Sequence, residues 1–90
     1  MSLFPLGRLL ATPGAIEALI ASGEQSASFV GRHARGDWGE VCAEDKALND
    51  ADVVEGGRLL SAYRTALGVR IWIITEADRS ATTILLPEEY

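Results

Sequence analysis

The chain has 90 residues, of which 48% are hydrophobic, so we expect one domain, residues 1–90, and exclude two independent cores. Thirteen Asp and Glu against eight Lys and Arg give a net charge of -5, which disfavours direct binding to a nucleic-acid backbone. One cysteine, Cys42, excludes an internal disulfide, and no apolar run approaches the roughly 20 residues of a membrane span, so we expect a soluble, cytoplasmic protein.

A short apolar run leads into the first helix. Residues 6–11 have the length and composition of an N-terminal strand. Thr12 is then a good helix N-cap, a proline follows at the first helical position, and Gly23 is placed to end the helix. These signals predict a helix over residues 13–22. Its expected apolar stripe consists of Ile16, Leu19 and Ile20.

Two further helices are predicted. One starts at Ser26 or Ser28 and stops at Gly36, and the other spans residues 43–55, ahead of two glycines. Between them, the turn residues around Trp38 indicate a loop that fixes this aromatic side chain into or onto the core. One face of the second helix holds Phe29, Val30 and His33, and the third helix repeats Ala47, Ala51 and Val54 at helical spacing with Leu48 beside them.

The last third of the chain changes to a β pattern. Alternating β-branched and aromatic residues predict strands over residues 58–64, 69–76 and 80–86, joined by loops of hairpin length. In the middle strand, Ile71 and Ile73 are expected to face the helices. The predicted fold class is α+β, with two to three short N-terminal helices packed on a three-stranded antiparallel β-meander and the N-terminal apolar run as a candidate fourth strand.

No set of catalytic residues stands out. The only histidine, His33, has candidate partners in Ser61, Ser80 and Cys42, but none of these lies in a nucleophile motif. We therefore interpret His33 as a structural residue that half-buries its ring and bonds a carbonyl. One His and one Cys cannot form a zinc site, the carboxylates lack calcium-loop spacing, and the glycines form no phosphate-binding loop. We predict no catalytic, cofactor-binding or metal-binding residue.

The most uneven feature is the charge of residues 37–55, where seven acidic residues face Lys46 alone. Such a run is often only a solvated helix surface. The alternative is an acidic face that binds a basic protein surface, with Trp38 at its edge as an aromatic anchor and the outer sheet face around Trp72 as a second candidate surface. The candidate protein-binding residues are Asp37, Trp38, Glu40, Glu44, Asp45, Asp52 and Trp72.

Four strings cover most of the chain: LGRLLATPGAIEAL, RHARGDWGE, GGRLLSAYRT and IWIITEADRSATTILLPEEY. In these strings the chain resembles a group of small bacterial proteins encoded on plasmids and integrated elements, known as plasmid-related proteins. The resemblance implies a common fold and transfers no catalytic or ligand residue. By association it implies a role in element maintenance or in countering host defence.

Three functions are open at this stage. The first is a non-enzymatic module that binds another protein through the acidic segment. The second is a small metal-free enzyme or toxin-like factor that uses Arg58, Tyr63, Glu76 and Arg79. The third is a structural homodimer module. We expect no cofactor and no membrane partner, and the net charge disfavours direct nucleic-acid binding.

Overall fold

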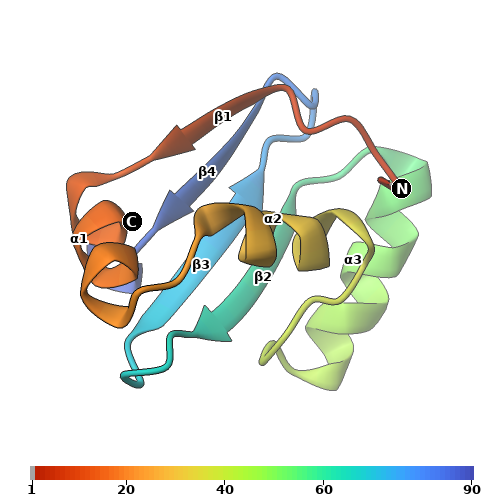
Figure 1. The fold of residues 1–90 in the computed structure, drawn as a ribbon. Coiled ribbons are helices and arrows are strands. Elements are labelled where there is room, and N and C mark those ends of the chain that lie inside the picture. The colour runs from red at the N-terminus through yellow and green to blue at the C-terminus, as the bar shows by residue number, and fades with distance from the viewer. Residues whose placement is uncertain (1) are drawn as a thin grey trace.

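A computed structural model describes residues 2–90, which form three α-helices and a four-stranded sheet (Figure 1). The helix α2 lies across one face of the sheet, α3 runs beside the edge strand β2, and α1 lies near the ends of β1 and β4. The elements are, in chain order, β1 (Arg8–Ala11), α1 (Pro13–Ser22), α2 (Ser26–Ala34), α3 (Ala43–Glu55), β2 (Leu59–Arg64), β3 (Arg70–Thr75), β4 (Ala81–Leu85) and the short 3-10 helix η1 (Pro87–Glu89).

The strands lie in the order β1-β4-β3-β2. The pairs β2·β3 and β3·β4 are antiparallel neighbours, which confirms the predicted meander. β1 pairs with β4 in parallel, with Arg8 opposite Ala81 and Ala11 opposite Ile84. Gly7 precedes β1 with a φ of 65°, and a Cβ there would lie 2.4 Å from the carbonyl oxygens of Arg79 and Ser80, so only glycine fits this approach.

The predicted α+β class is therefore confirmed, and its finer description is corrected in two respects. The sheet is mixed, because the candidate N-terminal strand is real and joins it in parallel. The helices do not all precede the sheet, since α1 to α3 follow β1 and η1 follows β4. A parallel pair needs a long crossover between its strands, and here the rest of the domain supplies it.

The main core lies between the sheet and the helices α1 and α2. Ile71 and Ile73 are fully buried on the helix-facing side of β3, as the alternation of the strand predicts. The buried cluster consists of Ala15, Leu19, Phe29, Val30, Tyr63, Ile71, Ile73 and Ile84. A smaller cluster of Phe4, Trp38 and Leu59 fills the space toward α3.

Two helices turn a different face to the core from the one their apolar spacing suggests. On α1, Ala15 and Leu19 are buried, whereas Ile20 is 74% exposed, so the predicted stripe is wrong except at Leu19. On α3 the one buried side chain is Asn49, and Val54 is 85% exposed. The apolar side formed by Leu48 and Val54 therefore points to solvent, whereas Val53 is partly buried against the cluster of Phe4, Trp38 and Leu59.

The position of α3 explains this reversal, because the helix seals the free edge of β2. The Asn49 amide accepts from the Leu60 N–H at 3.3 Å and donates to the Leu60 carbonyl at 2.8 Å. Two residues further along β2, Ala62 exchanges backbone hydrogen bonds with Trp38 and Glu40. A sheet edge offers unpaired backbone groups, so the helix that covers it needs a polar side chain where it faces them.

Arg79 ties the β3–β4 turn to the end of α3. Its guanidinium donates to the carbonyls of Asp52, Gly57 and Glu76 at 2.8, 2.6 and 3.1 Å, and lies 5.6 Å from the centre of the Phe4 ring. The bonds to Asp52 and Gly57 therefore hold the turn against the last residues of α3 and the segment that follows it.

We expect Ile73→Ala to lower the free energy of unfolding by about 2–4 kcal/mol, because truncating a fully buried isoleucine leaves a cavity in a small core. Ile20→Ala removes the same atoms from a side chain that is 74% exposed, and its effect should stay within about 0.5 kcal/mol. Urea unfolding of the two variants measures the difference, and equal losses would show that the two isoleucines are misplaced.

Candidate functional site

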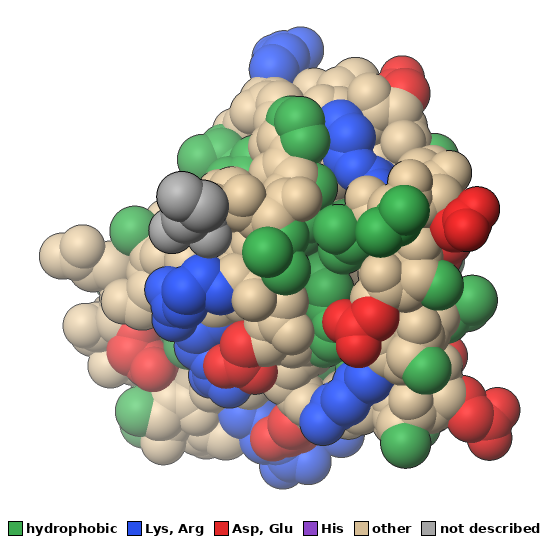
Figure 2. Space-filling model, turned by 90° about the vertical axis from the view of Figure 1, so that its right-hand side faces the viewer, with side chains coloured by type: hydrophobic (Ala, Val, Ile, Leu, Met, Phe, Trp, Pro, Cys, Tyr) green, Lys and Arg blue, Asp and Glu red, His purple; other side chains and the backbone are tan. Residues whose placement is uncertain are grey.

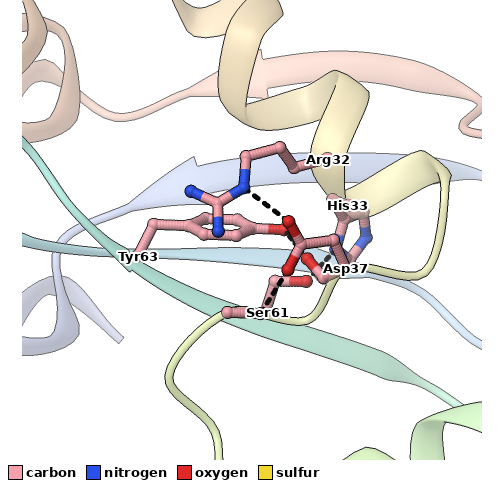
Figure 3. Close-up of polar contacts among 6 residues, drawn as sticks. Arg32, His33, Asp37, Ser61 and Tyr63 are labelled. Carbon is pink, nitrogen blue, oxygen red and sulfur yellow. Dashed lines mark hydrogen bonds and ion pairs between the residues drawn. The ribbon is translucent and has the colours of Figure 1, made fainter.

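A buried histidine lies beside a serine, the pair that a nucleophilic site would need. His33 on α2 points toward Ser61 of the sheet (Figure 3), and its Nδ1 lies 2.5 Å from the Ser61 hydroxyl. Its Nε2 lies 2.9 Å from the Thr75 hydroxyl. The Thr75 and Thr82 hydroxyls are 2.7 Å apart, and Thr82 donates to the Leu6 carbonyl at 2.7 Å. The interpretation of His33 as structural fits this arrangement, but its expected half-burial and carbonyl partner are wrong.

The order of donors in this chain of hydrogen bonds follows from counting protons. The Thr82 hydroxyl donates its one proton to the Leu6 carbonyl, so it must accept from Thr75. The Thr75 hydroxyl then accepts from the His33 Nε2–H. Nδ1 is then the acceptor for Ser61, which requires a neutral imidazole. Burial lowers the pKa of His33 to about 4, and the nearby Arg79 charge adds to the shift.

The Ser61–His33 pair is closed to substrates. Both side chains are 0% exposed, and the imidazole is oriented by a threonine instead of a carboxylate. A nucleophile must meet its substrate and its base must accept a proton near neutral pH, and neither condition holds here. The geometry supports a structural role for the cluster.

The loop after α2 uses its acidic groups within the chain. Asp37 accepts from Arg32 at 2.7 Å, and this hydrogen bond holds the pKa of Asp37 below its usual value. The Arg32 guanidinium also lies over the Tyr63 ring (Figure 3), and the distance to the ring centre is 4.5 Å. Glu40 accepts from Arg64 at 2.9 Å. Asp37 and Glu40 are exposed but already paired with cations of their own domain.

Trp38 is not the exposed anchor that the sequence suggested. Its side chain is 3% exposed, stacks with Phe4 at 6.1 Å between ring centres, and donates its indole N–H to Asp50 at 2.9 Å. The flanking turn residues correctly indicated a fixed aromatic, but they cannot distinguish a ring turned inward from one turned outward.

The exposed side of α3 combines apolar and acidic groups. Leu48 is 60% and Val54 is 85% exposed. Figure 2 looks at this side of the molecule and shows hydrophobic and acidic side chains next to one another. We define the outer α3 face by the exposed residues that share this side at helical spacing: Glu44, Ala47, Leu48, Ala51, Val54 and Glu55.

Of the other two acidic candidates on α3, Asp45 is exposed beside this face, while Asp52 is partly buried against Gly57. The helical spacing of Leu48 and Val54 predicts that they face the core, whereas the structure buries Asn49 instead. Only this difference identifies the two residues as an exposed apolar pair. Asn49 itself carries no recognisable sequence signal.

Trp72 lies apart from the outer α3 face. It is half-buried on the sheet face opposite α1 and α2, where its ring meets Tyr90 edge-on at 5.8 Å between centres. The candidate residues therefore divide between the loop after α2, α3 and the outer sheet face, and the structure brings only Glu44 and Asp45 together with the exposed apolar groups of α3.

The alternative catalytic set is dispersed. Arg58 bonds the Tyr90 hydroxyl at 2.7 Å, whereas Tyr63 points to the helix-facing side and donates to the Asp37 carbonyl at 2.5 Å. Burial raises the pKa of Tyr63 to about 12, so its phenol does not serve as a base near neutral pH. Arg79 is occupied by three backbone carbonyls. These groups face no common site.

Within residues 2–90, no cluster of His, Cys, Asp and Glu has the geometry of a metal site, and none of the helices has the length and hydropathy to cross a membrane. Comparison of the chain with protein-family models, with curated proteins and with solved structures found no match. The site must therefore be interpreted from its own geometry.

We expect the His33 imidazole to titrate near pH 4 and the fold to lose roughly 3 kcal/mol of stability between pH 6.5 and pH 4. The folded protein holds the ring neutral, so this contribution is complete above the unfolded pKa of about 6.5 and is lost as the unfolded chain takes up the proton. Since His33 is the only histidine, NMR reports its titration without ambiguity.

The control is His33→Gln, which keeps all carboxylates and removes only the titrating ring. Its stability should fall less steeply over the same pH interval in urea unfolding. An NMR pKa of 6 or above in the folded protein would contradict the buried, neutral imidazole.

Proposed function

We propose that the protein is a non-enzymatic module that binds another protein through the outer α3 face. The observation that carries this proposal is the orientation of α3, whose apolar residues Leu48 and Val54 point to solvent while its inner side seals a sheet edge through Asn49. An apolar helix face is stabilised by burial, and this domain provides no burial for it. A partner that covers the face would bury Leu48 and Val54.

The chemistry of the face defines the partner. Glu44 and Glu55 lie at the two ends of the apolar side, and Asp45 lies beside it. A matching surface is an apolar groove with basic residues at its rim, in which α3 lies lengthwise and places its side chains at helical spacing. Opposite charges accelerate such encounters, and burial of the apolar residues supplies the affinity.

The resemblance to plasmid-related proteins supplies a context for this module. We propose a bacterial, cytoplasmic partner with a basic surface, such as a host defence or DNA-processing protein, whose blocking would serve the maintenance of a mobile element. A net charge of -5 suits an occupant of a surface that otherwise holds nucleic acid. Self-association through the same face is the competing outcome, and the experiment below separates the two.

We expect the double variants Leu48→Gln/Val54→Gln and Glu44→Lys/Glu55→Lys each to weaken partner capture about tenfold or more. Stability should change by less than about 1 kcal/mol, because all four side chains are exposed and the opposite helix-end effects of the two lysines offset one another. Affinity capture from a bacterial lysate, quantified by mass spectrometry, measures the loss, and capture by the unaltered chain should weaken as salt rises.

Leu67→Gln and Glu17→Lys are matched controls, since both residues are exposed and lie outside α3. They should capture the same partner as the unaltered chain. If all four variants capture it equally, the outer α3 face is only solvated surface. If the unaltered chain sediments as a dimer and the α3 variants sediment as monomers, the face binds a second copy instead.

A further inference from the structure

The sheet face opposite α1 and α2 contains a hollow that the proposed binding function does not use. Its volume is about 300 Å³, at the lower end of the range for small-molecule sites. Neighbouring residues of β2 and β3 form its floor, with Leu60 opposite Ile74 in the strand register. Its lining consists of Arg58, Leu60, Trp72, Ile74 and Tyr90.

The wall formed by Tyr90 is fixed at two points. Its hydroxyl accepts from Arg58 at 2.7 Å, and the Arg58 guanidinium lies 5.1 Å from the centre of its ring. The preceding residue, Glu89, accepts hydrogen bonds from the Thr12 hydroxyl and, at 3.1 Å, from the Gly14 N–H at the start of α1. Tyr90 is nevertheless 67% exposed, so this wall stands up from the sheet surface beside Trp72.

The chemistry of the lining selects one kind of occupant. Two aromatic rings and two aliphatic side chains favour an aromatic group that packs on the floor of the hollow against Trp72. Arg58 is the only charged residue of the lining, and one of its five N–H donors is used by Tyr90. The remaining donors match the two oxygens of a carboxylate.

We propose that this pocket binds a small aromatic carboxylate, with the ring against Trp72 and the carboxylate on Arg58. A single cation balances a single negative charge, whereas a phosphodiester chain would need further cations along its path and would meet a chain of net charge -5. The pocket shares no residue with the outer α3 face, because its lining comes from Arg58, the strands β2 and β3, and Tyr90.

The test uses NMR titration of the isotope-labelled, full-length chain with benzoate and indole-3-acetate at millimolar concentration, and with the neutral analogues benzamide and indole-3-acetamide. At least one acid should shift the Trp72 indole N–H and the backbone amides of residues 58, 60 and 74 in a saturable manner. The amide of that acid should bind at least about tenfold more weakly, because it cannot form the charged hydrogen bonds. Trp72→Phe assigns the indole signal relative to that of Trp38.

Two arginine variants separate the pocket from the general charge of the sheet. Arg58→Gln should reduce binding of the acid to the level of its amide, whereas Arg70→Gln, on an exposed residue outside the lining, should leave it unchanged. Both variants should keep the dispersed spectrum of the folded chain, since neither side chain is buried.

Three results would overturn the proposal. One is the absence of a saturable shift with either acid, and another is equal affinity for an acid and its amide. The third is that the oligonucleotide dT10 binds more tightly than either acid and that both Arg58→Gln and Arg70→Gln weaken its binding. This result would make the face a surface for single-stranded nucleic acid.

Discussion

The hydrogen bonds of the buried His33 imidazole hold α2 and the sheet in one register. From this ring, the bonds pass through hydroxyls on β2, β3 and β4 and end on the Leu6 carbonyl before β1. The side chains of His33, Ser61, Thr75 and Thr82 are fully buried and each donates one hydrogen bond, so the loss of any one leaves another without a partner at a cost of about 1–3 kcal/mol. A slide of α2 by one turn would break the bonds at both ring nitrogens. Apolar packing alone would not impose this position.

Local signals fixed the elements well, because they reside in a few neighbouring residues. Thr12 before a proline, Gly23 after the first helix and the change to alternation before β2 place the boundaries within one or two residues of those observed. The parallel pairing of β1 was not predictable in this way, since Arg8 and Ala81 are distant in sequence and nothing local specifies the partner or the direction of a strand.

The candidate site was predicted less well for a physical reason. Helical spacing shows that α3 has an apolar side, but not that this side turns outward. The orientation depends on Asn49, whose amide replaces a neighbouring strand at the edge of β2, and an asparagine in a helix gives no sign of that role. Trp38 shows the converse, because its charged surroundings suggested a surface residue while its indole fills the gap beside Phe4.

The two edges of the sheet are protected by different means. Along β2, side-chain and loop groups take the place of a further strand, and Gly39 permits this close approach because a Cβ there would lie 2.0 Å from the Ala62 carbonyl oxygen. β1 has only four residues, which limits the edge it presents to another strand. Because α3 covers the edge of β2 with its inner side, Leu48 and Val54 on its outer side stay exposed. The protected edge and the proposed recognition surface therefore both result from the placement of α3 along β2.

The parallel pairing of β1 with β4 also sets an order of events during synthesis. The first strand finds its neighbour only after residues 81–84 have been made, and the first turn of α1 receives the Glu89 carboxylate later still. Until then the helices α1 and α2 have at most the β2–β3 hairpin to pack on, and the sheet that buries their apolar residues is incomplete. Contacts between distant parts of a chain form slowly. Until residues 81–84 have left the ribosome, the segment that precedes them is therefore exposed to chaperones and proteases, and the pairing of β1 with β4 is a late step in its protection.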